Sequence, residues 1–262
     1  MIPIRKHLAL TLVLVVFTFS GCTREAVGRP KPSPPVPAAS VPPPLRVVVF
    51  VDQSRSMEAA RVAPVSAANF LGVYERFAAS GGELAVGLIR DDSDRPFARL
   101  YIPPPPDVPA AQALPQNVFA AAVARKRENE ERARSEEAQR VWRAEMGSRQ
   151  AAFARSIEPL LARPADAPAT DIFSALRRAD VLLSEPNVFP RGTRNVVILV
   201  SDGVETVADG AAAPRLNAPA EIVLVNGAGA IGSLSSLAPV RFESLDAALR
   251  YAVSKGGAHG RQ

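Results

Sequence analysis

The stretch that decides the fold is VVVFVDQSRSM, residues 47–57. Its first five residues are all apolar, which predicts a strand covered on both faces of a mostly parallel sheet. The loop that follows carries Asp52, Ser54 and Ser56 to the carboxyl edge of that sheet, where open α/β folds bind their ligands. One carboxylate and two hydroxyls form an all-oxygen set, which hard divalent cations prefer.

The rest of the chain alternates between further strands and helices. Helices are predicted over 62–79, from 170 to about 184, and after 244, because their apolar residues recur at helical spacing. Four polar residues, 91–94, are interpreted as a hairpin turn. This alternation predicts a doubly wound α/β fold, a mostly parallel sheet with helices on both faces. Its further strands are expected at 83–90, 97–102, 195–201, 221–225 and 240–242.

A long charged segment interrupts this pattern within an insertion at about 103–165. From Val118 to about Leu161 the sequence predicts one long helix or two in series. Between Val123 and Val141 it has no large apolar residue, so this section should not pack in a core. We interpret it as a solvated helix that links two core-contacting ends. The alternative is a projecting arm or a partner-binding helix. Three acid-before-base pairs at i,i+4 should support it, namely Glu128/Arg132, Glu130/Arg134 and Glu136/Arg140.

The first 21 residues have the features of an export signal. Arg5 and Lys6 precede an apolar run of about a dozen residues, which is too short to span a membrane. The run ends in Ser20-Gly21-Cys22, which resembles a bacterial lipobox with Cys22 as the lipidated residue. The alternative is a plain secretory signal with an incidental cysteine. We expect a lipid-anchored protein of the bacterial cell envelope. By resemblance to enterobacterial lipoproteins, in which Asp after the cysteine favours retention in the inner membrane, Thr23 favours the outer membrane.

The remaining composition places one domain at 46–254. Residues 22–45 are rich in Pro and Ala and predict an extended tether behind the lipid, and residues 255–262 form a polar tail. Removing residues 1–21 lowers the formal charge from +5 to +3, because two bases and no acid are lost. No basic stripe interleaved with aromatic residues is present, so nucleic acid is not an expected partner. A single cysteine rules out an internal disulfide.

Three segments together suggest a metal site. Asp52, Ser54 and Ser56 follow the first strand, Thr170 precedes a helix, and Asp202 follows a later apolar strand. In this order they resemble the metal-ion-dependent adhesion site of von Willebrand factor A domains. The resemblance implies that both serines ligate the ion directly, Thr170 directly or through water, and the two aspartates mainly through water. Mg²⁺ is the expected ion, with Mn²⁺ and Ca²⁺ as alternatives.

Each of these residues also has a simpler interpretation. The serines could be turn residues, Thr170 only the N-cap of its helix, and Asp202 only a turn former before Gly203. Arg55 departs from the small or polar residue expected between the serines. It adds positive charge, which could weaken metal binding or attract an acidic partner.

Binding rather than catalysis is the expected function. An aspartate after a first strand also begins haloacid-dehalogenase-like phosphatases, but those need a second aspartate where this chain has Ser54. After removal of the signal only His259 remains as a histidine, in the polar tail. Two hypotheses remain. The first is a module that presents its ion to a carboxylate of a partner protein. The second is a scaffold subunit of an envelope complex that binds through the long helix, with the metal structural or absent.

Overall fold

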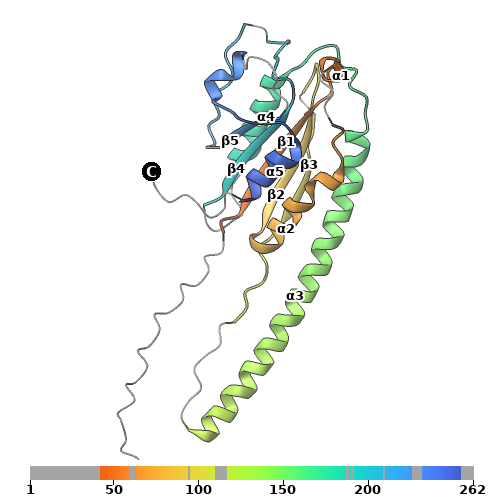
Figure 1. The fold of residues 1–262 in the computed structure, drawn as a ribbon. Coiled ribbons are helices and arrows are strands. Elements are labelled where there is room, and N and C mark those ends of the chain that lie inside the picture. Colours follow the sequence, from red (N-terminus) through yellow and green to blue (C-terminus); the bar gives the residue numbers. More distant parts are fainter. Residues whose placement is uncertain are drawn as a thin grey trace, which may run out of the picture. The chain divides into compact units, whose positions relative to one another are not determined.

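The computed structural model describes residues 42–59, 63–93, 95–109, 117–186, 189, 192–208, 210–225 and 232–254. They form a six-stranded sheet with the order β3-β2-β1-β4-β5-β6, in which only β3 runs antiparallel to its neighbour. Figure 1 shows this sheet with helices on both sides. The mixed, mostly parallel α/β architecture predicted from the sequence is therefore confirmed. The strands are β1 (Leu45–Asp52), β2 (Gly82–Ile89), β3 (Ala98–Ile102), β4 (Arg194–Val200), β5 (Glu221–Val225) and β6 (Val240–Phe242).

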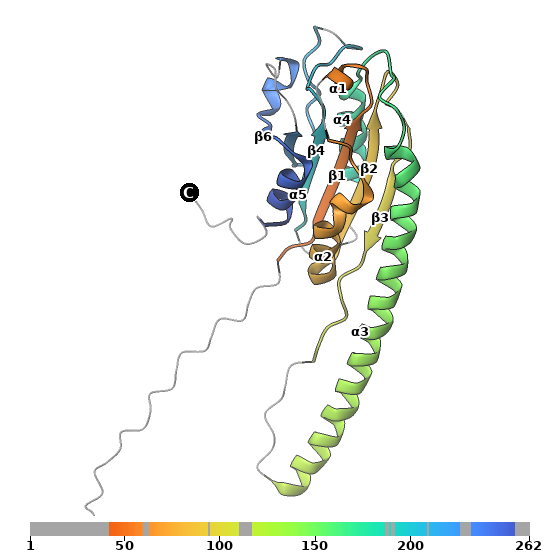
Figure 2. The same ribbon diagram turned by 45° about the vertical axis from the view of Figure 1, so that its right-hand side comes forward.

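The central strands are buried on both faces. All eight residues of β1 are buried, and its side chains alternate between two apolar cores. Val47, Val49 and Val51 join the core under helices α2 (Leu71–Ser80) and α5 (Leu245–Ser254). Val48 and Phe50 join the opposite core, which is formed mainly by α4 (Ile172–Ser184). Figure 2 shows α2 and α5 together on one side of the sheet.

The segment after β1 differs in detail from the prediction. A short helix α1 (Ser56–Ala59) follows the strand after three residues, and the sequence did not predict it. The helix expected over 62–79 begins later, as a 3-10 turn η1 (Ala67–Phe70) that continues into α2. Gly81 ends α2 with a φ of 73°, as expected for a glycine just past a helix.

The long helix is a single element, α3 (Val118–Leu161), with 44 residues and a length of about 66 Å. Only Met146, Phe153 and Ile157 are buried, and all three lie in its second half. Val118 and Phe119, at its first turn, are 80% and 86% exposed. The interpretation of a helix that contacts a core at both ends is therefore wrong. Figures 1 and 2 show the first half extending past the end of the sheet, as the projecting-arm alternative predicts.

The charged pairs on α3 agree with prediction only in part. Arg132 pairs with Glu128 at 3.1 Å, as predicted. Arg140 pairs with Glu137 three residues before it, not with Glu136. Arg134 donates to the backbone oxygen of Glu130 rather than to its carboxylate. Glu128 is partly buried, and the other groups are exposed.

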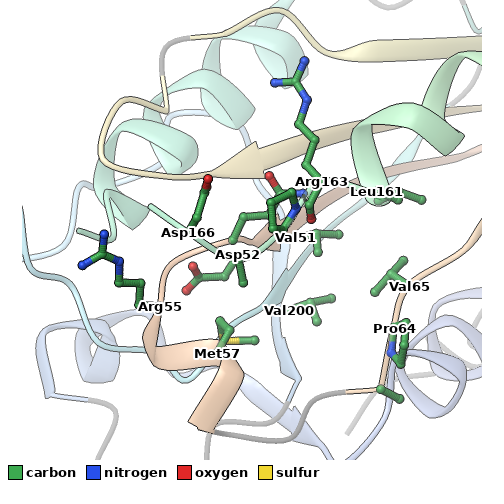
Figure 3. Close-up of a pocket in the computed structure, with 14 residues that line it drawn as sticks. Val51, Asp52, Arg55, Met57, Pro64, Val65, Leu161, Arg163, Asp166 and Val200 are labelled. Carbon is green, nitrogen blue, oxygen red and sulfur yellow. Dashed lines mark hydrogen bonds between the residues drawn. The ribbon is translucent and has the colours of Figure 1, made fainter. Parts of the chain in front are cut away.

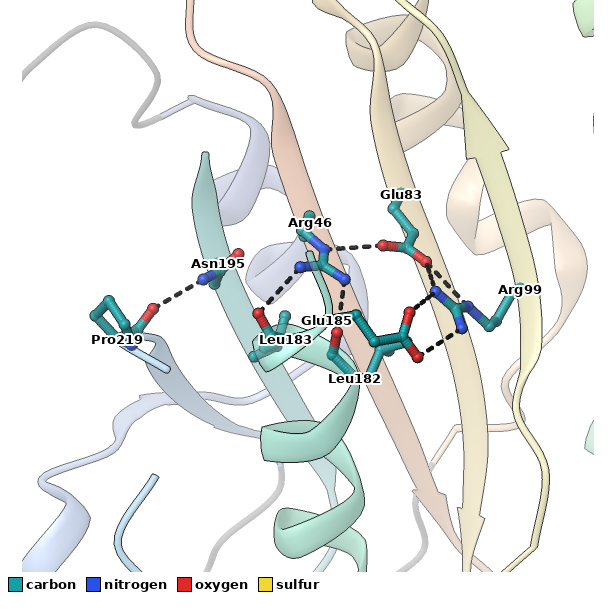
Figure 4. Close-up of polar contacts among 8 residues, drawn as sticks. All are labelled: Arg46, Glu83, Arg99, Leu182, Leu183, Glu185, Asn195 and Pro219. Atoms are coloured by element: carbon teal, nitrogen blue, oxygen red, sulfur yellow. Dashed lines mark hydrogen bonds and ion pairs between the residues drawn. The ribbon is translucent and has the colours of Figure 1, made fainter. Parts of the chain in front are cut away.

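A buried arginine fixes the C-terminal end of α4 against the sheet (Figure 4). Arg46 on β1 is 5% exposed, and its Nε donates to Glu83 on β2 at 2.8 Å. Its two terminal nitrogens donate to the backbone oxygens of Leu182 and Leu183, at 2.7 and 3.1 Å. These two carbonyls lie in the last turn of α4, where intrahelical donors run out. That of Leu182 also accepts from the N–H of Glu185, just past the helix, at 3.2 Å. Arg46 therefore satisfies them and positions α4 along β1.

Several expectations fall outside the described residues. The export signal at 1–21, Cys22, Thr23, most of the tether and the tail with His259 belong to this group. Within the described part of the chain, no helix is long and apolar enough to cross a membrane.

Candidate metal centre

The candidate site lies where the sheet reverses its order of winding. From β1 the chain continues to β2 on one side, whereas β4, the neighbour of β1 on the other side, continues to β5. The loops after β1 and β4 therefore leave toward opposite faces, and a crevice forms between them at the carboxyl edge. Asp52 ends β1, and Ser201 and Asp202 follow β4. The predicted placement of the two aspartates at one sheet edge is confirmed.

Asp52 is held by hydrogen bonds to both of its oxygens. Its side chain accepts from the backbone N–H of Ser54 at 2.8 Å and from the hydroxyl of Ser201 at 2.6 Å. The residue is 4% exposed, and this burial raises the pKa of the carboxyl above its usual value of 3.8. The two hydrogen bonds oppose that rise in pKa, whereas the negative charge of Asp202 adds to it. A cation at this edge would offset both the cost of burying the Asp52 carboxylate and its repulsion by Asp202.

The two serines of the first loop lie side by side. The hydroxyl oxygens of Ser54 and Ser56 are 2.9 Å apart. Ligands at Mg²⁺ lie at roughly 2.1 Å, so two neighbouring octahedral ligands are about 3.0 Å apart. The observed separation therefore fits two ligands of one ion. Ser54 is buried and Ser56 is exposed, so this pair connects the interior to the surface.

Thr170 reaches the same edge through backbone pairing. The segment before it runs beside the first loop, because Arg55 N–H donates to Ala167 at 3.1 Å and Ala167 N–H donates to Gln53 at 3.0 Å. Thr170 N–H also donates to the hydroxyl of Thr206, at 2.7 Å, and the N–H of Thr206 donates back to the Thr170 carbonyl at 3.0 Å. Thr170 therefore lies between the β1 and β4 loops. Its assignment as N-cap is wrong, because Asp171 accepts from Ser174 N–H and caps α4.

Asp202 begins a turn at the other side of the crevice. Its side chain accepts from Val204 N–H at 3.0 Å, and Gly203 adopts a φ of 83° that favours glycine. Direct contacts join Asp52, Ser54 and Ser56, whereas Asp202 acts on Asp52 through its charge. Asp202 therefore forms a turn before Gly203, as its simpler interpretation predicted. Ligation of a metal by these five residues stays a prediction.

The sequence reasoning missed two residues that build the site. Ser201 binds Asp52 directly, although the sequence assigned it only to the end of a strand. Glu205, 7% exposed, accepts from the N–H groups of Phe173, Val207 and Ala208 at 2.8–2.9 Å. It ties the β4 loop to the first turn of α4. The only signal for either residue was its position close to Asp202.

The electrostatics of the site come from few charged groups. No cluster of three or more His, Cys, Asp or Glu side chains that could hold a metal occurs in the described ranges. The candidate set instead combines two carboxylates with three hydroxyls. Neutral ligands leave more of the charge of an ion unneutralised, so this donor set suits an ion that must still attract an outside ligand.

A cavity of about 580 Å³ opens beside Asp52 (Figure 3). Val51, Val200 and Met57 form part of its apolar wall, whereas Arg55 and Asp166 lie on the side of Asp52. Arg90 donates to Asp166 at 2.8 Å and so holds that carboxylate at the border of the cavity. The crevice therefore has room for side chains of another molecule next to the candidate metal ligands.

Comparisons with known proteins give no family. No family model matches the chain, and no curated protein matches it. Among solved structures it is similar to the pilus adhesin SpaC from Lactobacillus rhamnosus GG. The open conformation matches at 12% identity with a TM-score of 0.38, and another crystal form at 11% with a TM-score of 0.40. Each match covers 82% of this chain and 30% of the adhesin, so the chain spans less than a third of that protein's length. At such low TM-scores these similarities carry no argument about function.

Proposed function

We propose that this protein is a metal-dependent protein-binding module of the von Willebrand factor A type. In this proposal Asp52, Ser54, Ser56, Thr170 and Asp202 hold Mg²⁺, and the ion is presented to an acidic group of a partner protein. The observation that carries it is the 2.9 Å separation of the two serine hydroxyls next to the buried carboxylate of Asp52. Hydroxyl pairs and carboxylates at one sheet edge are the donors that Mg²⁺ accepts.

The chemistry of the site supports binding rather than turnover. Asp52 is the only carboxylate at the end of β1, and both of its oxygens already accept hydrogen bonds. The position two residues later is Ser54, which cannot act as a general acid or base unaided. We therefore propose no catalytic step. Arg55, which is exposed at the border of the cavity, would attract a partner carboxylate toward the ion.

The proposal includes an envelope location for the module. By the lipobox resemblance, Cys22 would carry the lipid anchor, and the Pro-rich segment that follows would separate the domain from the membrane. Globomycin treatment of cells that express the chain tests this part, because it blocks cleavage of lipoprotein signals. We expect the uncleaved precursor to accumulate, and unchanged processing would contradict the anchor.

Metal titration of the full chain tests the site. We expect Mg²⁺ and Mn²⁺ to bind with one ion per chain in calorimetry, and the variant Ser54→Ala/Ser56→Ala to lose at least about tenfold in affinity. The matched control is Ser148→Ala, an exposed serine on α3. Equal affinities of both variants would refute the assignment, provided that circular dichroism shows the same fold.

A chelator experiment separates the two binding hypotheses. In crosslinking experiments on the native envelope, capture of partner proteins should be lost when EDTA is added and when Asp52 is replaced by Ala. Capture that survives both changes and disappears when residues 125–140 are deleted would instead support the scaffold hypothesis. Phosphatase turnover that is abolished by Asp52→Asn would contradict both hypotheses.

A further inference from the structure

One face of the first half of α3 is exposed along its whole length. The residues through which α3 contacts the domain, including Met146 and Phe153, lie on one side of the helix. At 100° per residue, Phe119 and Lys126 lie roughly 160–180° away from Met146. We call the side with Phe119, Ala122, Lys126, Asn129, Ala133, Glu136 and Arg140 the outer face; all seven residues are exposed.

The outer face is hollowed at its centre. A shallow cavity of about 570 Å³ lies there, and the small side chains of Ala122 and Ala133 leave space for a close approach. Charged residues surround this hollow on both sides. The cavity is lined by Ala122, Arg125, Lys126, Asn129, Glu130 and Ala133.

The charges on this half of the helix complement a reversed copy of the same segment. Consider two copies of α3 that run antiparallel and cross at residue 131. Residue n of one copy then lies level with residue 262 − n of the other copy. Near the outer face, opposite charges then lie at the same level in two kinds of pair, which are Arg125 with Glu137 and Lys126 with Glu136. A two-fold axis repeats each pair, so the pattern is self-complementary.

We propose that the first half of α3 is a homodimerisation element, which pairs antiparallel with the outer face of α3 in a second copy of this chain. The overlap runs from 118 to 144 and is about 40 Å long. In this register Phe119, 86% exposed in the single chain, packs beside Ala144 and opposite Arg143 of the second copy. The domains lie at opposite ends of the helix pair, because the buried residues of each α3, Met146, Phe153 and Ile157, lie beyond the overlap.

The same segment offers a weaker case for a membrane partner. Val118, Phe119 and Val123 are exposed and precede a run of three bases, 125–127, which would suit anionic lipid headgroups. Three acids follow at once, at 128, 130 and 131, and anionic lipids would repel them. A second copy offers Glu136 and Glu137 to these bases and brings no anionic surface to the three acids, so the charge pattern favours self-association.

Charge exchange between copies tests the proposal by analytical ultracentrifugation. All samples are full chains with Cys22→Ser, so that no lipid joins the copies. We expect the parent chain to dimerise, and Arg125→Glu/Lys126→Glu and Glu136→Lys/Glu137→Lys each to weaken the dimer at least about tenfold at low salt. An equimolar mixture of the two variants should restore the dimer, because opposite charges then meet at both ends.

Matched controls identify the competing outcomes. Arg155→Glu/Arg250→Glu changes the net charge equally at exposed positions outside the overlap, and should leave the dimer intact. EDTA should also leave it intact, which separates this contact from metal-dependent binding. A monomeric parent chain, or two variants that do not associate when mixed, would overturn the proposal. Retention by anionic phospholipid vesicles that requires Arg125 and Lys126 in a monomeric chain would show the membrane to be the partner instead.

Discussion

Replacing Arg46 with Met should destabilise the protein far more than other changes of a single charge. The guanidinium group makes three hydrogen bonds, to the Glu83 carboxylate and to two carbonyls at the end of α4. Methionine keeps much of the apolar length of the side chain but donates nothing. The substitution therefore leaves the buried Leu183 carbonyl without its donor, takes one of two donors from the Leu182 carbonyl, and removes one of the two arginines bound to Glu83.

The magnitude follows from these lost partners. Breaking a buried ion pair by removing one partner costs about 3–5 kcal/mol. Glu83 keeps its contact to Arg99 at 2.6 Å, which reduces its share of that cost. A buried carbonyl without a partner adds about 1–3 kcal/mol. We therefore expect a loss of about 4 kcal/mol in the free energy of unfolding and a fall in Tm of roughly 10 °C.

Urea unfolding followed by circular dichroism measures this loss, with Arg99→Met as the control. Arg99 also binds Glu83 and Glu185, but its side chain is 41% exposed, so water can replace it and the cost should be about 1 kcal/mol or less. The double variant Arg46→Met/Glu83→Leu should recover part of the loss, because no carboxylate remains buried at this position. Equal losses for Arg46→Met and Arg99→Met would refute the reasoning.

Four further predictions concern packing and the candidate site. Gly82→Ala would place a Cβ 2.2 Å from the Phe77 ring, so urea unfolding should show a loss of about 1–3 kcal/mol, whereas Gly72→Ala meets no atom within 4 Å and should not destabilise. Glu205→Ala should cost about 2 kcal/mol in the same assay and weaken Mn²⁺ binding in calorimetry, because three N–H groups lose their acceptor. Asp52 has a pKa above 3.8 in the folded protein, so the metal-free chain should lose stability relative to Asp52→Asn as the pH rises from about 3.8 through that raised pKa. Mg²⁺ should raise the Tm of the unsubstituted chain and not that of Asp52→Asn, and an equal rise in both would contradict metal binding at this residue.

The strands, and the burial of the central ones on both faces, could be predicted because a local run of apolar residues indicates each of them. A run such as 47–51 has only one environment in which every side chain is covered, the interior of a sheet with helices on both faces. The carboxyl ends of parallel strands share one edge, so the common location of Asp52 and Asp202 also followed from the sequence. No side-chain geometry was needed for either prediction.

The position of the long helix could not be predicted in the same way. A charged segment without large apolar residues indicates an exposed helix. The segment is equally exposed whether the helix contacts the core at both ends or only at one. The first turn was expected to contact a core, and its apolar residues Val118 and Phe119 are both exposed. Their apolar character fits instead an association with another molecule, which a single sequence cannot display.

The supporting residues of the candidate site were missed because their partners are distant in sequence. Ser201 and Asp52 are 149 residues apart, and Glu205 lies 32 residues from the helix start that it holds. The two ends of α4 are fixed by different groups, Arg46 at the last turn and Glu205 at the first. Because Thr170 directly precedes that first turn, its place beside the β1 loop depends on both contacts. A change at Arg46, at the far end of the sheet, should therefore weaken metal binding as well as stability, whereas a change at exposed Arg99 should alter neither by much.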